Sequence, residues 1–239
     1  MRAFVACPSG RYAFADWLPL VLEWMRGEDA GIRVRTSNRV DYGRSLLIAE
    51  ALRLSPEWTI MIDSDVLPIT SMREVLELAR ENLSAGYGVS VSPLRSIAGT
   101  VLARPVIRIG DTPPPTDRPW DVYAASAGFV VVSLDALLRL SVLGTFTNDA
   151  ANVEHPAYCH HTLDETEDSV LFRNFSRGGV RICADPRMEV LHLKPAGIPS
   201  YGAEGKDVIY EHSLPGFSGR NVSPEHNSVI ITEPSGGSG

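Results

Sequence analysis

The sequence predicts an α/β domain in which helices flank a mostly parallel central sheet. Short apolar runs alternate with amphipathic stretches over roughly the first ninety residues, which is the pattern of strand–helix units that build such a sheet. Further apolar runs follow, and from Ala196 onward Gly, Pro and Ser dominate. We therefore expect an irregular C-terminal tail behind the α/β part.

The first half of the chain supplies the alternating elements. Helical stripes of apolar residues and the capping box Ser71-x-x-Glu74 mark the helices. Buried strands are indicated by short apolar runs, the first of which stops at the turn signal Pro8-Ser9-Gly10. We expect strands at residues 3–7, 32–36, 58–62 and 87–91. We expect helices at residues 13–26, 44–54 and 72–83.

The second half is less regular. Prolines make residues 111–119 a stiff loop, because proline cannot donate a backbone hydrogen bond. A capping-box variant, Asp164-x-x-Glu167, is expected to open a helix that ends at Gly178-Gly179. A short helix is expected at residues 134–140. Strands are expected at residues 100–109, 129–132, 180–183 and 188–193.

Composition narrows the class of protein. The 239 residues are 44% hydrophobic and 21% charged, which is enough apolar material for a core. The net charge of −7 argues against a broad nucleic-acid surface. Three cysteines without C-x-x-C exclude a disulfide framework and fit a reducing compartment. With no signal-peptide pattern and no membrane-length apolar run, we expect a soluble, cytoplasmic protein.

The triplet Asp63-Ser64-Asp65 directly follows the apolar run 58–62. Ligands of open α/β sheets bind beyond the carboxyl ends of the strands. Two carboxylates are hard oxygen donors that suit Mg²⁺ or Mn²⁺, and such an ion usually brings a phosphate with it. The plainer alternative is a strand that ends in a solvated loop, because D-x-D is a short pattern.

Three further motifs follow the triplet in order. They are Ser126-Ala127-Gly128 before an inner strand, Thr166-Glu167-Asp168 at a helix start, and His192 at the end of a late strand. Together with the paired aspartates they resemble the GT-A family of nucleotide-sugar glycosyltransferases, over residues 3–195. Gly43-Arg44-Ser45 is also similar to the family's helix start upstream of D-x-D. Four motifs in this order are more specific than any one of them.

The resemblance implies a metal-dependent transfer from a nucleotide-sugar, with a UDP-sugar expected and Mn²⁺ or Mg²⁺ as cofactor. Asp65 would bind the ion, Asp63 would touch ribose or ion, and His192 would be a further ligand. Lys194 would neutralise the diphosphate as a point charge. The ordinary alternatives are a histidine satisfied at a strand end and a solvated lysine.

The resemblance also implies where the donor lies. Pro8, Ser9 and Arg11 occupy the place that grips base and ribose, and Arg44 would reach the base or the diphosphate. Ser64 lies within the donor-binding triplet. Gly128 would let the backbone approach the sugar closely. Turn residues and a surface arginine are the plain alternative.

By resemblance to inverting members, Asp168 would take the proton from the acceptor hydroxyl, with Glu167 beside it. Acids in the first turn of a helix are also ordinary partners of the helix dipole. Asp164 and Glu165 crowd the same turn, so which carboxylate faces the acceptor stays open. Retaining relatives use no clear base, so the stereochemistry is open too. We interpret Cys159-His160-His161 as a loop near the acceptor rather than a zinc site, because no second cluster stands at zinc spacing.

The predicted domain limits are a GT-A domain at 1–200, an extension at 201–233 that packs on or near the active site, and a flexible linker at 234–239. The acceptor is open: a glycan, a small molecule, a protein, or a hydroxymethyl-pyrimidine in DNA. The DNA alternative requires that arginines gather beside the site to contact phosphates. Those arginines are Arg104, Arg108, Arg118, Arg173, Arg177, Arg181 and Arg187.

Other classes of protein fit the triplet less well. Asp63-Ser64-Asp65-Val66 resembles the motif of haloacid-dehalogenase-like phosphatases, but that motif normally ends the first strand. Their lysine would have to be Lys194 or Lys206, which are the only lysines. A nucleotidyltransferase would need a longer Gly-rich basic loop than Pro8-Ser9-Gly10-Arg11. A non-enzymatic carbohydrate-binding module has no use for an acid set that binds Mn²⁺ and UDP.

Overall fold

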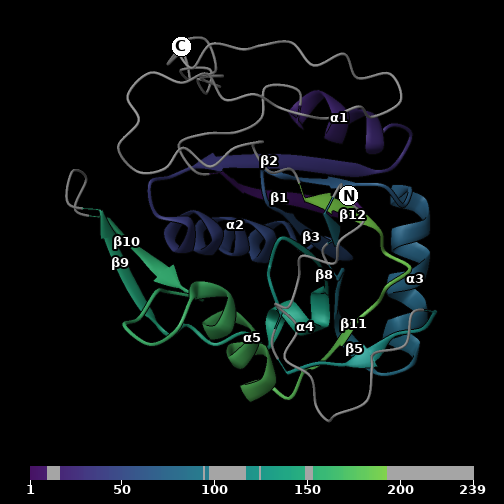
Figure 1. Ribbon diagram of the computed structural model, residues 1–239. Helices are drawn as coiled ribbons and strands as arrows, with labels where there is room; N and C mark the ends of the chain where they lie inside the picture. The colour runs from purple at the N-terminus through teal and green to yellow at the C-terminus, as the bar shows by residue number, and fades with distance from the viewer. Residues whose placement is uncertain (10–16, 94, 97–116, 124, 149–152, 193–239) are drawn as a thin grey trace, which may run out of the picture.

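The computed structural model describes residues 1–9, 17–93, 95–96, 117–123, 125–148 and 153–192 (Figure 1). Several sequence predictions lie outside these residues: the strand at 100–109, most of the proline-rich loop, the tail and the linker. Arg11 and Lys194 lie outside them as well. Among the described residues, no helix is both long enough and apolar enough to span a bilayer.

The described helices and strands largely follow the predicted order. The helices are α1 (Trp17–Trp24), α2 (Val40–Leu54), α3 (Met72–Ser84), α4 (Leu134–Leu138) and α5 (Glu167–Arg177). The first strands are β1 (Ala3–Ser9), β2 (Ala30–Thr36), β3 (Trp58–Ile62), β4 (Val66–Pro68), β5 (Tyr87–Val91) and β6 (Arg95–Ser96). The later strands are β7 (Trp120–Asp121), β8 (Phe129–Ser133), β9 (Gly144–Asn148), β10 (Val153–Ala157), β11 (Arg181–Ala184) and β12 (Val190–His192).

The central sheet has seven strands in the order β2-β1-β3-β8-β5-β11-β7. Strands β2, β1, β3, β5 and β11 run in one direction, whereas β8 and β7 run against them. The predicted α/β class with a mostly parallel sheet is therefore confirmed. Because β8 is antiparallel to β3, its first residues lie at the edge where β1 and β3 end. Three chain segments therefore meet at this edge.

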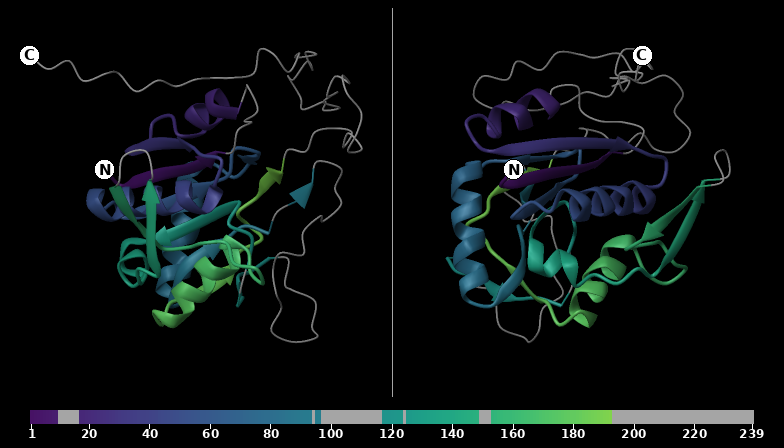
Figure 2. Two further views of the ribbon diagram at one scale, coloured as in Figure 1. Left: turned by 90° about the vertical axis from the view of Figure 1, so that its left-hand side faces the viewer. Right: turned by 180° about the vertical axis from the view of Figure 1, so that it is seen from behind.

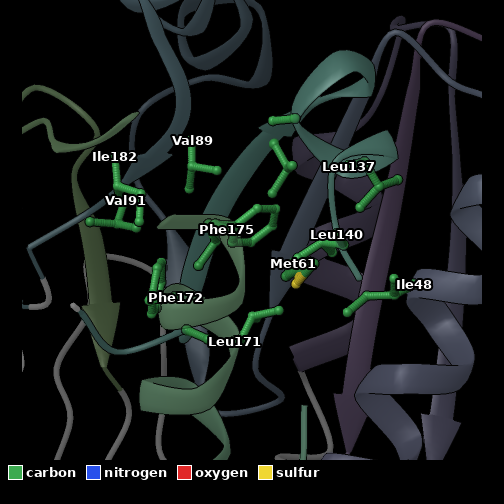
Figure 3. Close-up of a cluster of buried hydrophobic side chains, with 14 of the residues drawn as sticks. Ile48, Met61, Val89, Val91, Leu137, Leu140, Leu171, Phe172, Phe175 and Ile182 are labelled. Atoms are coloured by element: carbon green, nitrogen blue, oxygen red, sulfur yellow. The ribbon is translucent and has the colours of Figure 1, made fainter. Parts of the chain in front are cut away.

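Helices cover both faces of this sheet (Figures 1 and 2). Apolar residues of α2, α4 and α5 share one buried cluster, and those of α1 and α3 share the other. Successive strand residues alternate between the clusters, so Met61 joins the first and Ile60 the second. In Figure 3, Phe172 and Phe175 of α5 lie in the first cluster. Burying a side chain of this size stabilises the fold by about 1.5–3 kcal/mol.

The helix caps test two sequence signals. Ser71 caps α3 and accepts a hydrogen bond from the Glu74 N–H, as predicted. The capping box expected at Asp164 is wrong: Thr166 caps α5 and accepts from the Ser169 N–H. Asp164 instead lies in a preceding turn, where the Thr162 hydroxyl accepts its N–H. The predicted end of this helix at Gly178 is confirmed.

Other differences concern elements near the site. Helix α2 begins at Val40, so Gly43-Arg44-Ser45 lies inside it rather than at its start. The late strand expected at 188–193 forms β12, and it belongs to a separate small sheet in the order β4-β12-β6. The antiparallel hairpin β9–β10 was not expected and projects from the body (Figure 1).

Candidate active site

The turn that holds the paired aspartates connects β3 to β4 at the carboxyl end of β3. The Asp63 N–H donates to the Gly128 carbonyl at 3.0 Å, and the Val66 N–H donates to the Asp63 carbonyl at 3.0 Å. On the other side, Trp17 Nε1 donates to the Val66 carbonyl at 2.7 Å. Gly128, directly before β8, and Trp17 of α1 thereby fix the backbone that presents both carboxylates.

His192 lies beside Asp65. Strand β12 pairs antiparallel with β4, and its register sets His192 opposite Val66. His192 Nε2 is 3.0 Å from Asp65 Oδ2. The side chains remain 24% and 43% exposed, respectively, so a ligand can reach the pair. The structure thus brings together two of the predicted metal ligands.

Arg44 is buried between carboxylates that come from different elements. Its Nη2 lies 3.0 Å from Asp63 Oδ1, and its Nη1 contacts Asp168 Oδ1. Glu167 Oε1 is 3.8 Å from Nη1. With only 2% of its side chain exposed, Arg44 faces carboxylates here rather than an open donor pocket. This differs from the donor contact that the sequence suggested.

The negative charge around Asp63 affects its ionisation. Burial raises the pKa of Asp63 to about 6, and the charges of Asp168 and Asp65 act in the same direction. Arg44 opposes this shift through its charge and its hydrogen bond. Burial is thus the main cause of the raised pKa, and the neighbouring carboxylates add to it.

The start of α2 holds the loop that leads to α5. The Ser45 hydroxyl accepts the N–H groups of Tyr158 and Cys159 at 3.2 and 3.4 Å. Asp41 accepts the His161 N–H at 3.2 Å. His161 Nδ1 in turn lies 3.0 Å from Glu167 Oε2. The Cys159-His160-His161 loop thus lies beside the acids of α5.

The other predicted donor residues are found at the same edge. Pro8 and Ser9 end β1 and are buried, and the Ser9 carbonyl accepts the Ser37 N–H at 3.0 Å. Ser64 is 9% exposed within the aspartate turn. Gly128 directly precedes β8, and its carbonyl accepts the Asp63 N–H. These residues therefore flank the aspartate turn on both sides.

Asp65 and His192 fit a divalent ion as a pair. In the part of the chain that the structure describes, no group of three or more His, Cys, Asp or Glu side chains is arranged as a ready metal cluster. Asp63 faces Arg44 instead. The 3.0 Å separation of Asp65 and His192 is about what two neighbouring octahedral ligands show at roughly 2.1 Å from an ion. An ion that also binds substrate phosphates is typically held by only one or two protein ligands.

Three of the seven arginines that the DNA alternative needs pair with carboxylates of the protein. Arg173 pairs with Glu165, and Arg187 pairs with Asp185 at 2.9 Å. Arg181 pairs with Asp121 at 3.0 Å and starts β11, at the edge of the sheet away from the aspartate turn. Arg104 and Arg108 lie outside the described residues. Arg173, Arg181 and Arg187 are therefore already engaged by carboxylates of the protein.

Two residues of the site were missed from the sequence. Asp41 precedes Arg44 on α2, where nothing in the local pattern distinguishes it from a solvated polar residue. Ser45 was named only as part of Gly43-Arg44-Ser45, without its contacts to Tyr158 and Cys159. Trp17 was expected only as part of an apolar stripe. Its indole N–H could have indicated a hydrogen bond to the site, because a buried tryptophan usually finds a hydrogen-bond acceptor.

Comparisons with known proteins place the fold. No family model matches the sequence, and no curated protein matches it. Among solved structures, A197 from STIV is 15% identical with a TM-score of 0.51, and the match covers 84% of this chain and 100% of A197. The likeness to A197 shows a shared fold.

Two further solved structures resemble the chain with lower TM-scores. S. aureus TarS in complex with UDP-GlcNAc is 11% identical with a TM-score of 0.49, and the match covers 86% of this chain and 62% of that one. A Drosophila β1,4-galactosyltransferase 7 with manganese, UDP-Gal and xylobiose is 9% identical with a TM-score of 0.38, over 81% of this chain and 71% of that one. The chain thus spans less than two thirds of that TarS structure.

Proposed function

We propose that this chain is a divalent-metal-dependent glycosyltransferase of the GT-A type. It would move a sugar from a nucleotide-sugar, with a UDP-sugar expected, to an acceptor hydroxyl. The observation that carries the proposal is one convergence at the carboxyl edge of the sheet. There the Asp65–His192 pair lies next to Asp63, which Arg44 joins to Asp168.

Asp65 and His192 would hold the ion, and a mixed carboxylate and imidazole set suits Mn²⁺ somewhat better than Mg²⁺. When bound, the ion would neutralise the diphosphate leaving group and orient it. Asp63 would lie between ribose and ion. Its carboxylate already faces Arg44, so we expect Asp63 to contribute less to ion binding than Asp65 and His192 do.

The donor would lie across the ends of β1, β3 and the start of β8. Pro8 and Ser9 would contact base and ribose, and Ser64 and Gly128 would line the sugar side. Arg11, two residues after Ser9, and Lys194, two residues after His192, would add positive charge. This placement follows the rule that α/β sheets bind ligands beyond the carboxyl ends of their strands.

Asp168 would accept the proton of the acceptor hydroxyl as that oxygen attacks the sugar, which gives an inverting transfer. Its Oδ1 contacts Arg44, which leaves Oδ2 to meet the acceptor. Glu167 is held by His161 and would line the same subsite. The transition state resembles an oxocarbenium ion, so nearby carboxylates stabilise it.

The phosphatase alternative is less well supported. Strands β1 and β2 precede β3 in the chain, and Asp63 pairs with Arg44 rather than standing free as a nucleophile. The nucleotidyltransferase alternative makes a different prediction, since such an enzyme would release pyrophosphate from a nucleoside triphosphate and a sugar phosphate.

A turnover screen tests the proposal. Purified protein is incubated with a panel of nucleotide-sugars and Mn²⁺, with water as acceptor, and nucleoside diphosphate release is measured with and without EDTA. We expect release from at least one donor, lost with EDTA and lost in Asp65→Ala. Asp135→Ala is the matched control, because Asp135 is 72% exposed on α4. Equal release by wild type and Asp65→Ala would overturn the metal assignment.

A further inference from the structure

The buried guanidinium of Arg44 connects the two halves of the candidate site. Its Nη2 binds Asp63 Oδ1 at 3.0 Å, and its Nη1 contacts Asp168 Oδ1. Asp63 directly follows β3, Asp168 lies in the first turn of α5, and Arg44 comes from α2. One side chain therefore spans three elements that are distant in sequence.

The contacts hold the guanidinium by its two ends. Among the described residues, its Nε has no hydrogen-bond partner, so the two terminal nitrogens carry the attachment to Asp63 and Asp168. Only an arginine presents two such nitrogens in one rigid plane. A lysine at this position would keep the charge, yet its single nitrogen could not keep both contacts at their present separation.

We propose that Arg44 is a positioning residue that fixes the Asp168 carboxylate relative to the donor side of the site. This inference rests on the proposed function. By holding Asp168 Oδ1, Arg44 sets the direction in which Oδ2 meets the acceptor. By holding Asp63, it ties that direction to the turn that carries Asp65. A misplacement of about 1 Å at a reacting group costs on the order of 10²-fold in rate.

This role differs measurably from the donor contact that the sequence suggested. A residue that grips the diphosphate or the base changes donor affinity when it is replaced. A residue that aims Asp168 changes kcat and leaves donor affinity in place. A residue that only supports the fold changes stability, and its effect on kcat does not depend on Asp168.

The experiment is a double-mutant cycle with Arg44→Lys and Asp168→Asn. UDP release from the donor that the screen selects gives kcat, and calorimetric titration with UDP and Mn²⁺ gives affinity. We expect Arg44→Lys to lower kcat at least tenfold while UDP affinity changes less than threefold. In the Asp168→Asn background, Arg44→Lys should lower kcat no further, because coupled residues are not additive. Losses that multiply in the double variant would overturn the proposal, and so would a loss of UDP affinity alone.

Arg39→Lys is the matched control. Arg39 is the other arginine near the start of α2, it pairs with Asp41, and it is 61% exposed. We expect it to leave kcat and UDP affinity unchanged.

A second variant covers the case in which Arg44→Lys does not fold. Asp168→Glu leaves Arg44 in place and moves the carboxylate outward by one methylene group. We expect it to lower kcat at least tenfold with UDP affinity intact, and an unchanged kcat would overturn the proposal. If wild type shows no Mn²⁺-dependent turnover, the proposed function fails and this inference with it. If wild type turns over and the variants match it, only the positioning role fails.

Discussion

His192 lies 3.0 Å from Asp65 although 127 residues separate them in the chain. Strand pairing is the reason: β12 runs antiparallel to β4, and His192 is set opposite Val66, the residue after Asp65. Asp65 directly precedes Val66, so this pairing brings the His192 side chain within reach of the Asp65 carboxylate. The metal assignment therefore depends on a small sheet that is separate from the central one.

His192→Ala tests the contribution of the imidazole to the ion. We expect Mn²⁺ affinity in the presence of UDP to fall about tenfold or more, and Mg²⁺ affinity to fall less, because imidazole is a softer ligand than oxygen. Titration calorimetry with each ion measures both. His155→Ala, on the hairpin strand β10, should change neither. Equal losses for the two ions would argue that His192 supports Asp65 without binding metal.

Asp168→Asn tests the proposed base. The amide keeps the shape of the side chain and a contact to Arg44 but cannot take a proton. General base catalysis contributes about 10²–10⁴-fold, so we expect kcat to fall by at least about 10²-fold. Donor KM should stay near that of wild type. Steady-state kinetics checks this prediction, and an unchanged kcat would move the role to another acid of this turn, with Glu167 as the next variant.

The sequence predicted the central strands well, because β1, β3 and β8 are mostly apolar runs whose residues are all buried. It also placed the aspartates at the end of β3. The predicted N-cap of α5 was wrong, since several neighbouring residues, Thr166 and Asp164 among them, are all favourable N-cap types. The local sequence pattern does not distinguish between such neighbours.

Local sequence pattern does not show the contacts that complete the site, because they depend on tertiary pairing. Only the family resemblance implied that His192 and Asp65 lie together. Nothing near Arg44 in the sequence indicates that its partners are Asp63 and Asp168. Equally, the three-residue strands β4 and β12 are too short to show a period. Their register, which brings His192 to Asp65, appears only once the chain is folded.

Trp17→Phe tests the hydrogen bond that holds the strand after the aspartates. Trp17 Nε1 donates to the Val66 carbonyl at 2.7 Å, and a net hydrogen bond of this kind contributes about 1 kcal/mol. Trp58→Phe is the matched control: Trp58 is equally buried, and its Nε1 has no hydrogen-bond partner among the described residues. In urea unfolding, Trp17→Phe should lower the free energy of unfolding by about 1 kcal/mol more than Trp58→Phe. Equal losses would show that the bond contributes nothing.

Asp41→Asn tests the hydrogen bond by which Asp41 of α2 holds the 159–161 loop. Burial opposes the ionisation of Asp41, but hydrogen bonds from Arg39, His161 and Tyr42 outweigh it, so its pKa lies below the ordinary value. A lowered folded pKa contributes stability above the unfolded pKa of about 3.9 and loses it as pH falls through the folded value. We expect Asp41→Asn to cost about 1–2 kcal/mol at pH 7. The difference from wild type should shrink below about pH 4, as urea unfolding at several pH values would show. A difference that is independent of pH would contradict the assignment of this shift to Asp41.

In the proposed function, Asp65 and His192 hold a divalent ion beneath the diphosphate of a nucleotide-sugar donor. The most direct measurement is calorimetric titration of wild type and Asp65→Ala with UDP, each with Mn²⁺ and with EDTA. We expect wild type to bind UDP at least tenfold more tightly with Mn²⁺ than with EDTA, and Asp65→Ala to show no such difference. Equal UDP affinity of wild type with Mn²⁺ and with EDTA would overturn the assignment of this ion site.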